Sequence, residues 1–365
     1  MRRYALVLLT LLIAAQSVHA QSKAPQRKLV FKRITLEHGL PASRINVILQ
    51  TRDGIMWFGT REGFVKYDDG AVTVYQPVRG GAAGLAANDV RAMYEDRSGI
   101  LWIGMFGSGL YRFDRVSGKL TQYKNNPENM NSLSDDRVLS ILEDHNGILW
   151  AGTVNGLNTF DRTNLNFSVI RNDPGNPMSL SENRVWPMAE DRDGNIWVGT
   201  LGGGINKLEK STGAIKTFRN DPQSMNSLAR NTVMALYTDR SGRLWVGTEE
   251  GGLDLFIYGK DEYDRQREEF RHFLQGMSVT SIVEDSAGNI IAGTLNSGIK
   301  VLDKATMTVT TAFANDPQDE KSLSDNDIRS LCMDRKKTLW VGTENSGVCV
   351  LIYEEVKPKK PRRIY

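Results

Sequence analysis

The chain has 365 residues, a formal net charge of +3 and the apolar and charged content of a globular protein. Because positive and negative residues nearly balance, no strongly basic domain emerges, which argues against nucleic acid as a partner. Beyond the first residues, no stretch is long and apolar enough to form a membrane helix.

The N-terminus has the pattern of a secretory signal peptide. Arg2 and Arg3 precede an apolar run over residues 6–15, and Val18-His19-Ala20 offers a small-residue cleavage site. We therefore expect a signal peptide over residues 1–20, cleaved after Ala20, and a short leader over residues 21–28. An uncleaved anchor is the alternative, although the apolar run is short for a bilayer.

One short pattern recurs seven times at intervals of 45 to 49 residues: a Trp or Ile, one further residue, then Gly. A period of this length indicates one supersecondary unit copied along the chain. Such units must stack on one another to bury their apolar faces. The seven anchor residues are Trp57, Trp102, Trp150, Trp197, Trp245, Ile291 and Trp340.

A single unit contains four short strands. In the third unit they are predicted over residues 138–143, 148–152, 157–161 and 165–170, separated by turns rich in Asn, Asp and Gly. A connector of the type Asn-Asp-Pro…Ser-Leu-Ser then leads to the next unit. The pattern predicts an all-β, seven-bladed β-propeller with four-stranded antiparallel blades over residues 29–353, the Trp side chains packing between blades.

The two ends of the chain suggest how the ring closes. The last unit supplies strands over residues 328–333, 339–342 and 348–353 and is followed by a basic, Pro-rich tail over residues 354–365. Residues 29–34 form a spare strand, which we expect to complete the last blade and so remove an exposed sheet edge. An open array needing further blades is the alternative.

The two cysteines are not expected to form a disulfide. Cys332 belongs to the first strand of the last unit and Cys349 to the third, so that one strand separates them. Two strand spacings amount to roughly 9–10 Å, which is beyond the reach of a disulfide.

The repeat also resembles a known family. The pattern Glu-Asp-x-x-Gly-x-Leu-Trp-x-Gly-Thr-x-x-Gly-Gly-Leu occurs in pieces at residues 95–110, 143–157 and 190–205, alongside the Asn-Asp-Pro connector. It resembles the two-component regulator propeller repeat over about residues 29–353, which is nearly the whole of the expected mature chain. The resemblance implies a periplasmic sensor region of a hybrid two-component histidine kinase, which in this family senses oligosaccharides.

The chain departs from the usual composition of that family. Such sensors carry two propellers, a β-sandwich, a membrane helix, a kinase core and a DNA-binding response regulator, none of which follows Tyr365. The resemblance thus implies a truncated sensor, a stand-alone protein or an excised fragment. A sensor kinase or another periplasmic domain would be its partner.

The candidate ligand site lies on one face of the expected ring, where the loops after the second and fourth strands meet. A guanidinium fork beside an aromatic surface suits sugar hydroxyls or a carboxylate. Alternatively, the arginines pair with neighbouring Asp and Glu, and Trp186 is packed in the channel. The candidate residues are Arg44, Arg61, Arg91, Phe106, Arg137, Arg184, Trp186, Glu249 and Arg329.

No other chemistry stands out in the sequence, and no metal or other cofactor is expected. The segment Asp191-Arg192-Asp193-Gly194-Asn195 begins like a calcium loop but lacks the Glu and the spacing of an EF-hand. No catalytic constellation is present. A propeller lyase or glycosidase using His38, Glu249 or Glu344 stays an alternative, as does a scaffold for docking proteins.

Overall fold

The computed structural model describes residues 27–76, 89–258 and 268–355. The predicted signal peptide, most of the predicted leader and nearly all of the predicted tail lie outside these residues. Within them, the only helix is the single 3-10 turn η1 (Leu36–His38), and no helix could cross a membrane.

The described strands form seven four-stranded antiparallel sheets, which we number as blades 1 to 7. Blade 1 contains β2 (Ile45–Gln50), β3 (Met56–Thr60), β4 (Gly63–Asp68) and β5 (Ala71–Tyr75), and blade 2 contains β6 (Val90–Glu95), β7 (Leu101–Met105), β8 (Gly109–Phe113) and β9 (Leu120–Tyr123). Blade 3 contains β10 (Val138–Glu143), β11 (Leu149–Thr153), β12 (Gly156–Asp161) and β13 (Asn166–Ile170). Blade 4 contains β14 (Val185–Glu190), β15 (Ile196–Thr200), β16 (Ile205–Leu208) and β17 (Ile215–Phe218). Blade 5 contains β18 (Val233–Thr238), β19 (Leu244–Thr248), β20 (Gly252–Ile257) and β21 (Glu269–Phe273). Blade 6 contains β22 (Ser278–Glu284), β23 (Ile290–Leu295), β24 (Ile299–Leu302) and β25 (Val309–Phe313). Blade 7 contains β26 (Ile328–Met333), β27 (Leu339–Thr343), β28 (Val348–Glu355) and, from the N-terminus, β1 (Arg27–Ile34).

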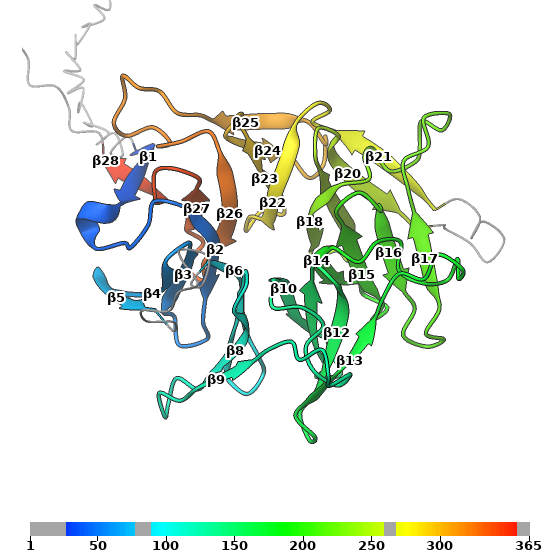
Figure 1. The fold of residues 1–365 in the computed structure, drawn as a ribbon. Helices are drawn as coiled ribbons and strands as arrows, with labels where there is room; N and C mark the ends of the chain where they lie inside the picture. The colour runs from blue at the N-terminus through cyan, green and yellow to red at the C-terminus, as the bar shows by residue number, and fades with distance from the viewer. Residues whose placement is uncertain (1–26, 77–88, 259–267, 356–365) are drawn as a thin grey trace, which may run out of the picture. The chain divides into compact units, whose positions relative to one another are not determined.

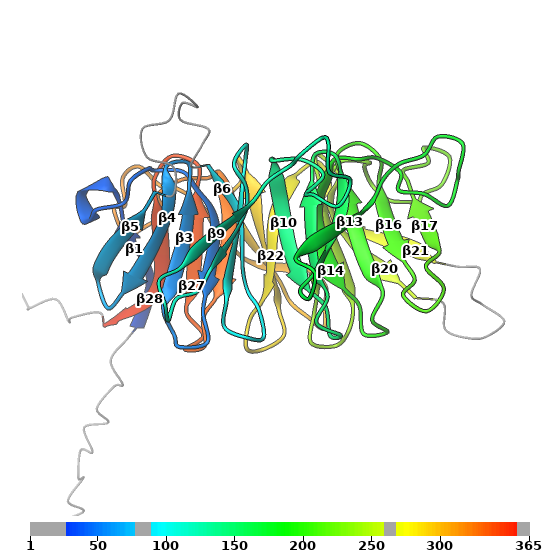
Figure 2. The ribbon, with the colours of Figure 1, turned by 60° about the horizontal axis from the view of Figure 1, so that its bottom comes forward.

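Within the compact unit Val30–Ile352, the blades form a closed ring around a central channel (Figure 1). The first strand of each blade contacts the first strands of its two neighbours, in the cyclic order β2, β6, β10, β14, β18, β22, β26 and back to β2. Figure 2 shows the strands running between the two faces of this ring. The predicted seven-bladed β-propeller is confirmed.

The Gly of the repeated pattern makes room for the neighbouring blade. A Cβ built on Gly199 would lie 2.6 Å from Cγ1 of Val233, the first residue of the next blade. The same clash recurs around the ring, and a Cβ on Gly342 in blade 7 would lie 2.8 Å from Cγ2 of Ile45 in blade 1. Carbon atoms cannot pack at such distances, so only Gly lets the blades approach this closely.

The repeated Trp side chains are core residues, each fixed by one hydrogen bond. The indole N–H of Trp197 donates to Asp191 Oδ2 at 2.8 Å, six residues earlier in the turn that precedes its strand. Equivalent bonds hold the other five, with Thr51 replacing the Asp in blade 1. In blade 6, where Ile291 has no side-chain N–H, Asn289 Nδ2 donates to Asp285 Oδ2 at 2.8 Å instead.

The N-terminal strand closes the last blade as predicted, in the strand order β1-β28-β27-β26. The strand begins at Arg27, two residues earlier than expected. A hydrogen bond from the Phe31 N–H to the Lys321 carbonyl at 2.8 Å ties it to the connector of blade 7. Cys332 and Cys349 are both unbridged, in agreement with the prediction.

Candidate functional site

A cavity of about 550 Å³ occupies the central channel. All seven first strands contribute to its lining, and turn residues such as Phe106 and Leu201 complete it at one face. Phe106 follows the second strand of blade 2, and its N–H donates to the carbonyl of Asp89, just before the first strand. The turns after the second strands and the connectors before the first strands therefore share the face at which the channel opens.

A β-bulge recurs at the same place in all seven blades. Pairing between the first and second strands shifts immediately after the first apolar residue of each first strand. Bulges re-aim side chains and are frequent beside functional sites. The residues at this bulge position are, in blade order, Asn46, Arg91, Leu139, Trp186, Met234, Thr280 and Arg329, and all but Met234 line the cavity.

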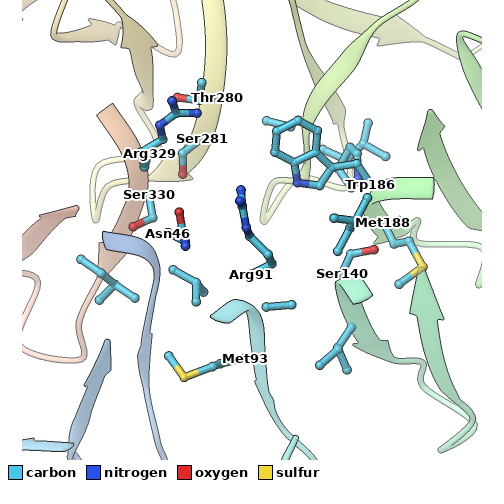
Figure 3. A pocket seen from close by; sticks show the side chains of 18 of the residues that line it. Asn46, Arg91, Met93, Ser140, Trp186, Met188, Thr280, Ser281, Arg329 and Ser330 are labelled. Carbon is cyan, nitrogen blue, oxygen red and sulfur yellow. The ribbon is translucent and has the colours of Figure 1, made fainter. Parts of the chain in front are cut away.

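The bulge residues divide the channel mouth into two sides (Figure 3). Thr280, Arg329, Asn46 and Arg91 come from four consecutive blades, 6, 7, 1 and 2, and form a polar side. Leu139 and Trp186 come from blades 3 and 4, and Figure 3 shows Trp186 and Met188 across the channel from Arg329. A single mouth thus offers hydrogen-bond donors on one side and an indole face on the other.

Positive charge is concentrated on the polar side. Arg44 Nη1 lies 3.2 Å from Glu344 Oε1, and the same carboxylate accepts a hydrogen bond from Arg329 Nε. Arg91 Nη2 bonds to Asp89 at 2.7 Å. Burial, and after it the nearby charge of Arg329, lowers the pKa of Arg44, with Arg91 adding to the effect. Three guanidinium groups at the mouth therefore pair with only two carboxylates.

Trp186 differs from the other six tryptophans. Trp186 lies in the channel wall and is half-buried, whereas five of the six core Trp side chains are buried. Within the described chain, its indole N–H has no hydrogen-bond partner, and its ring makes no contact with another aromatic ring. Figure 3 shows the indole at the edge of the cavity, opposite Arg329.

The structure brings five of the nine predicted site residues together, namely Arg44, Arg91, Phe106, Trp186 and Arg329, all of which line the cavity. The Arg91 guanidinium lies 5.1 Å from the centre of the Phe106 ring. Arg44, Arg91 and Arg329 are nevertheless paired with carboxylates, as the alternative interpretation expected, and so are Arg137 and Arg184, which lie outside the cavity lining. Arg137 Nε donates to Asp135 Oδ1 at 2.8 Å, and Arg184 lies 3.3 Å from Glu182, because in each case a carboxylate two residues earlier captures the side chain.

Arg61 and Glu249 are also outside the cavity lining. Both are exposed in the turns after second strands. Arg61 still acts on the site through its charge, which contributes to the lowered pKa of Arg44.

Sequence reasoning missed Asn46 and Thr280. Asn46 accepts from Arg44 Nε at 2.8 Å and donates to Asp89 at 2.9 Å, so it holds two charged side chains in place. Thr280 Oγ1 donates to the Ile328 carbonyl at 2.6 Å, across to blade 7. Both directly follow the first apolar residue of a first strand, as do Arg91, Trp186 and Arg329. Aligning the repeats on that column would have found them.

The residues considered for catalysis have other contacts. His38 Nδ1 accepts from the Thr35 N–H at 3.2 Å beside η1 and does not line the cavity. Glu344 is held between Arg44 and Arg329. In the segment resembling a calcium loop, Asp191 accepts hydrogen bonds from Asp193, Asn195 and Trp197. Among residues 27–76, 89–258 and 268–355, no three metal-ligating side chains gather in a group.

Solved propeller structures resemble the chain along most of its length. The extracellular domain of BT3049 from B. thetaiotaomicron, described as a hybrid two component system, has a TM-score of 0.75 and 23% identity; the match covers 89% of this chain and 42% of that one. Virginiamycin B lyase from Staphylococcus aureus has a TM-score of 0.65 and 16% identity, over 89% of this chain and 99% of the lyase. At these identities the likeness shows the fold.

Sequence comparisons identify the repeat itself. Histidine kinase P4 from Formosa agariphila is 34% identical over 64 residues, which make up 18% of this chain and 5% of the kinase. The family model for the two component regulator propeller matches residues 39–62, 84–107, 132–155, 179–202, 227–250 and 322–345. These segments contain the six core Trp residues, and the unit with Ile291 lies outside them. The chain therefore belongs to the two component regulator propeller family.

Proposed function

We propose that this protein is an exported, periplasmic ligand-binding propeller of two-component signal transduction, and that its ligand is an oligosaccharide held at the channel mouth. In this proposal a sensor kinase or another periplasmic domain reads the bound state. Export rests on the N-terminal sequence pattern. N-terminal sequencing of the exported protein should find Gln21 first.

The observation that carries the ligand proposal is the two-sided mouth. A pyranose ring has an apolar face of C–H groups and a rim of hydroxyls. Trp186 offers an indole with no partner in the described chain, and Asn46, Thr280 and the arginines offer polar groups across the channel. The cavity volume of about 550 Å³ falls within the range of small-ligand sites.

Binding assays with neutral and acidic oligosaccharides test this proposal. By isothermal titration calorimetry, one or more of them should bind without being cleaved. Trp186→Ala should weaken that binding by about tenfold or more, as for a buried aromatic anchor. Trp186→Phe keeps an aromatic face and should retain most of the affinity.

Other results would favour the other functions. If mass spectrometry detected a cleavage product of a bound saccharide, the protein would be an enzyme. If no oligosaccharide bound and a periplasmic protein docked on the ring regardless of Trp186, the scaffold function would replace the proposed one.

A further inference from the structure

The arginines that line the mouth outnumber the carboxylates that pair with them. The guanidinium groups of Arg44, Arg91 and Arg329 line the cavity, and two carboxylates, Glu344 and Asp89, neutralise them. Glu344 is shared by two of the arginines. One positive charge is left over at a partly enclosed site, where it interacts more strongly than it would in bulk water.

The arginines also retain unused donors. The contacts of Arg91 within the described chain involve Nε and Nη2, and the contact of Arg329 involves Nε. Arg44 is held through Nε and Nη1. This leaves Nη1 of Arg91, Nη2 of Arg44 and both terminal nitrogens of Arg329 for another acceptor. In Figure 3 the Arg91 side chain reaches toward the middle of the channel, between Arg329 and Trp186.

An acceptor for these donors should itself carry negative charge. Guanidinium N–H groups bind a carboxylate or a sulfate more strongly than a neutral hydroxyl, because the hydrogen bond is then charge-assisted. The ligand must also be apolar on the opposite side, since Trp186 and Met188 lie across the channel from Arg329. A uronic acid residue has both features in one ring: a carboxylate at one end and an apolar C–H face.

We propose that the channel mouth selects acidic saccharides, with the carboxylate bound between Arg91 and Arg329 and the sugar ring lying on Trp186. This inference rests on the proposed function and adds the substrate class. Arg44 acts here as a positioning residue. It holds Glu344, which pairs with Arg329, and Asn46, which bonds to Asp89, the partner of Arg91.

The test uses matched pairs of ligands. Uronate tetramers from pectin, alginate and glucuronan are each compared with the same tetramer after reduction of its carboxyl groups to primary alcohols, by isothermal titration calorimetry. The acidic member of the recognised pair should bind at least about tenfold more tightly than the reduced one, as expected for one charge-assisted contact. Its affinity should also fall as salt is raised from 0.05 to 0.5 M.

Variants then locate the charge contact. Arg329→Gln leaves Glu344 paired with Arg44, and Arg91→Gln leaves Asp89 bonded to Asn46, so neither strands a carboxylate. Each should lower the affinity for the acidic tetramer about tenfold and leave that for the reduced tetramer unchanged. Arg137→Ala, on the same face but bonded to Asp135 and outside the cavity, is the matched control and should change neither affinity.

The outcomes separate the two claims. Equal affinity for acidic and reduced tetramers, with Trp186→Ala weakening both, would overturn the selection of acidic saccharides and leave the oligosaccharide function standing. Tighter binding of a sulfated neutral oligosaccharide than of any uronate would replace the carboxylate with a sulfate ester. Absence of binding by both members of every pair and by neutral glycans would overturn the proposed function and this inference with it.

Discussion

At the scale of single residues, Trp186 shows how a repeat reveals its exceptions. Six tryptophans sit at one repeated position with their N–H groups bonded, and their burial is explained by packing between blades. Trp186 lies on a first strand instead of at that repeated position, and its indole N–H has no hydrogen-bond partner in the described chain. A large aromatic side chain exposed to a cavity without a structural partner is a feature of binding sites.

A second residue-scale feature is a shared proton in blade 5. His272 Nε2 lies 2.8 Å from the Met225 carbonyl oxygen, which can only accept, while Nδ1 lies 2.7 Å from Asp254 Oδ1. Since Nε2 must carry a hydrogen, a second proton has to lie between the ring and the carboxyl group. Burial raises the pKa of Asp254 despite the hydrogen bond from His272. Burial is the largest single effect and opposes charge on His272, but the hydrogen bond to Asp254, the charge of Asp254 and the bond to the Met225 carbonyl together raise the pKa of His272.

This pair predicts a loss of stability at alkaline pH. Because the folded-state pKa of His272 is raised, its contribution is full below the ordinary value of 6.5 and is lost as pH rises through the folded value. The raised pKa of Asp254 acts in the same direction. We expect the melting temperature to fall by about 2 °C or more between pH 6 and pH 9.

Asp254→Asn should reduce this fall, because an Asn amide can donate to the neutral imidazole. Asn158 and Asn206 occupy the same place in blades 3 and 4. Differential scanning calorimetry at the two pH values measures the effect. His38→Gln is the control, since the His38 ring bonds to Thr35 alone in the described chain. An unchanged pH dependence in Asp254→Asn would refute the assignment.

At the scale of elements, most of the fold could be predicted from the periodicity of the strands, and most of the remainder from the residue types in the turns. The prediction for residues 138–143 matched β10, and the second strand of that blade was displaced by one residue. The bulges could not be predicted, because the residue types at the bulge position differ from blade to blade and share no turn signal. An alignment on the residue before each first strand therefore includes Arg137 and Arg184 and leaves out Asn46 and Thr280.

The repeated Gly sets the packing between blades, and this can be measured. In Gly199→Ala the new Cβ would lie 2.6 Å from Val233 and 2.7 Å from Pro187. We expect a loss of about 1–3 kcal/mol in the free energy of unfolding, as for an overpacked core, measured by urea titration. Gly175→Ala, whose Cβ would approach only Asp173 at 3.4 Å, should cost little. Equal stability of the two variants would show that the blades can separate at this point.

At the scale of the whole molecule, the ring is closed by strands from opposite ends of the sequence. Strand β1 covers the edge of β28, and the Arg335 N–H donates to Gln50 Oε1 at 2.9 Å between blades 7 and 1. Without β1 the edge of β28 would be open for pairing with another chain.

Deleting residues 27–34 should lower the melting temperature and produce dimers or larger species in size-exclusion chromatography. The cause is the uncovered edge, so a synthetic peptide of the sequence RKLVFKRI added in trans should restore both properties. A scrambled peptide of the same composition is the control. A deletion variant that stayed monomeric with an unchanged melting temperature would contradict closure by β1.

The central claim is that the channel mouth is the ligand site, and the structure of a complex tests it most directly. Crystals grown with the tightest-binding saccharide tetramer should show one sugar ring against the indole of Trp186 and its acidic group within hydrogen-bond distance of Arg91 or Arg329. A saccharide bound elsewhere on the ring, with the mouth occupied only by water, would contradict the account.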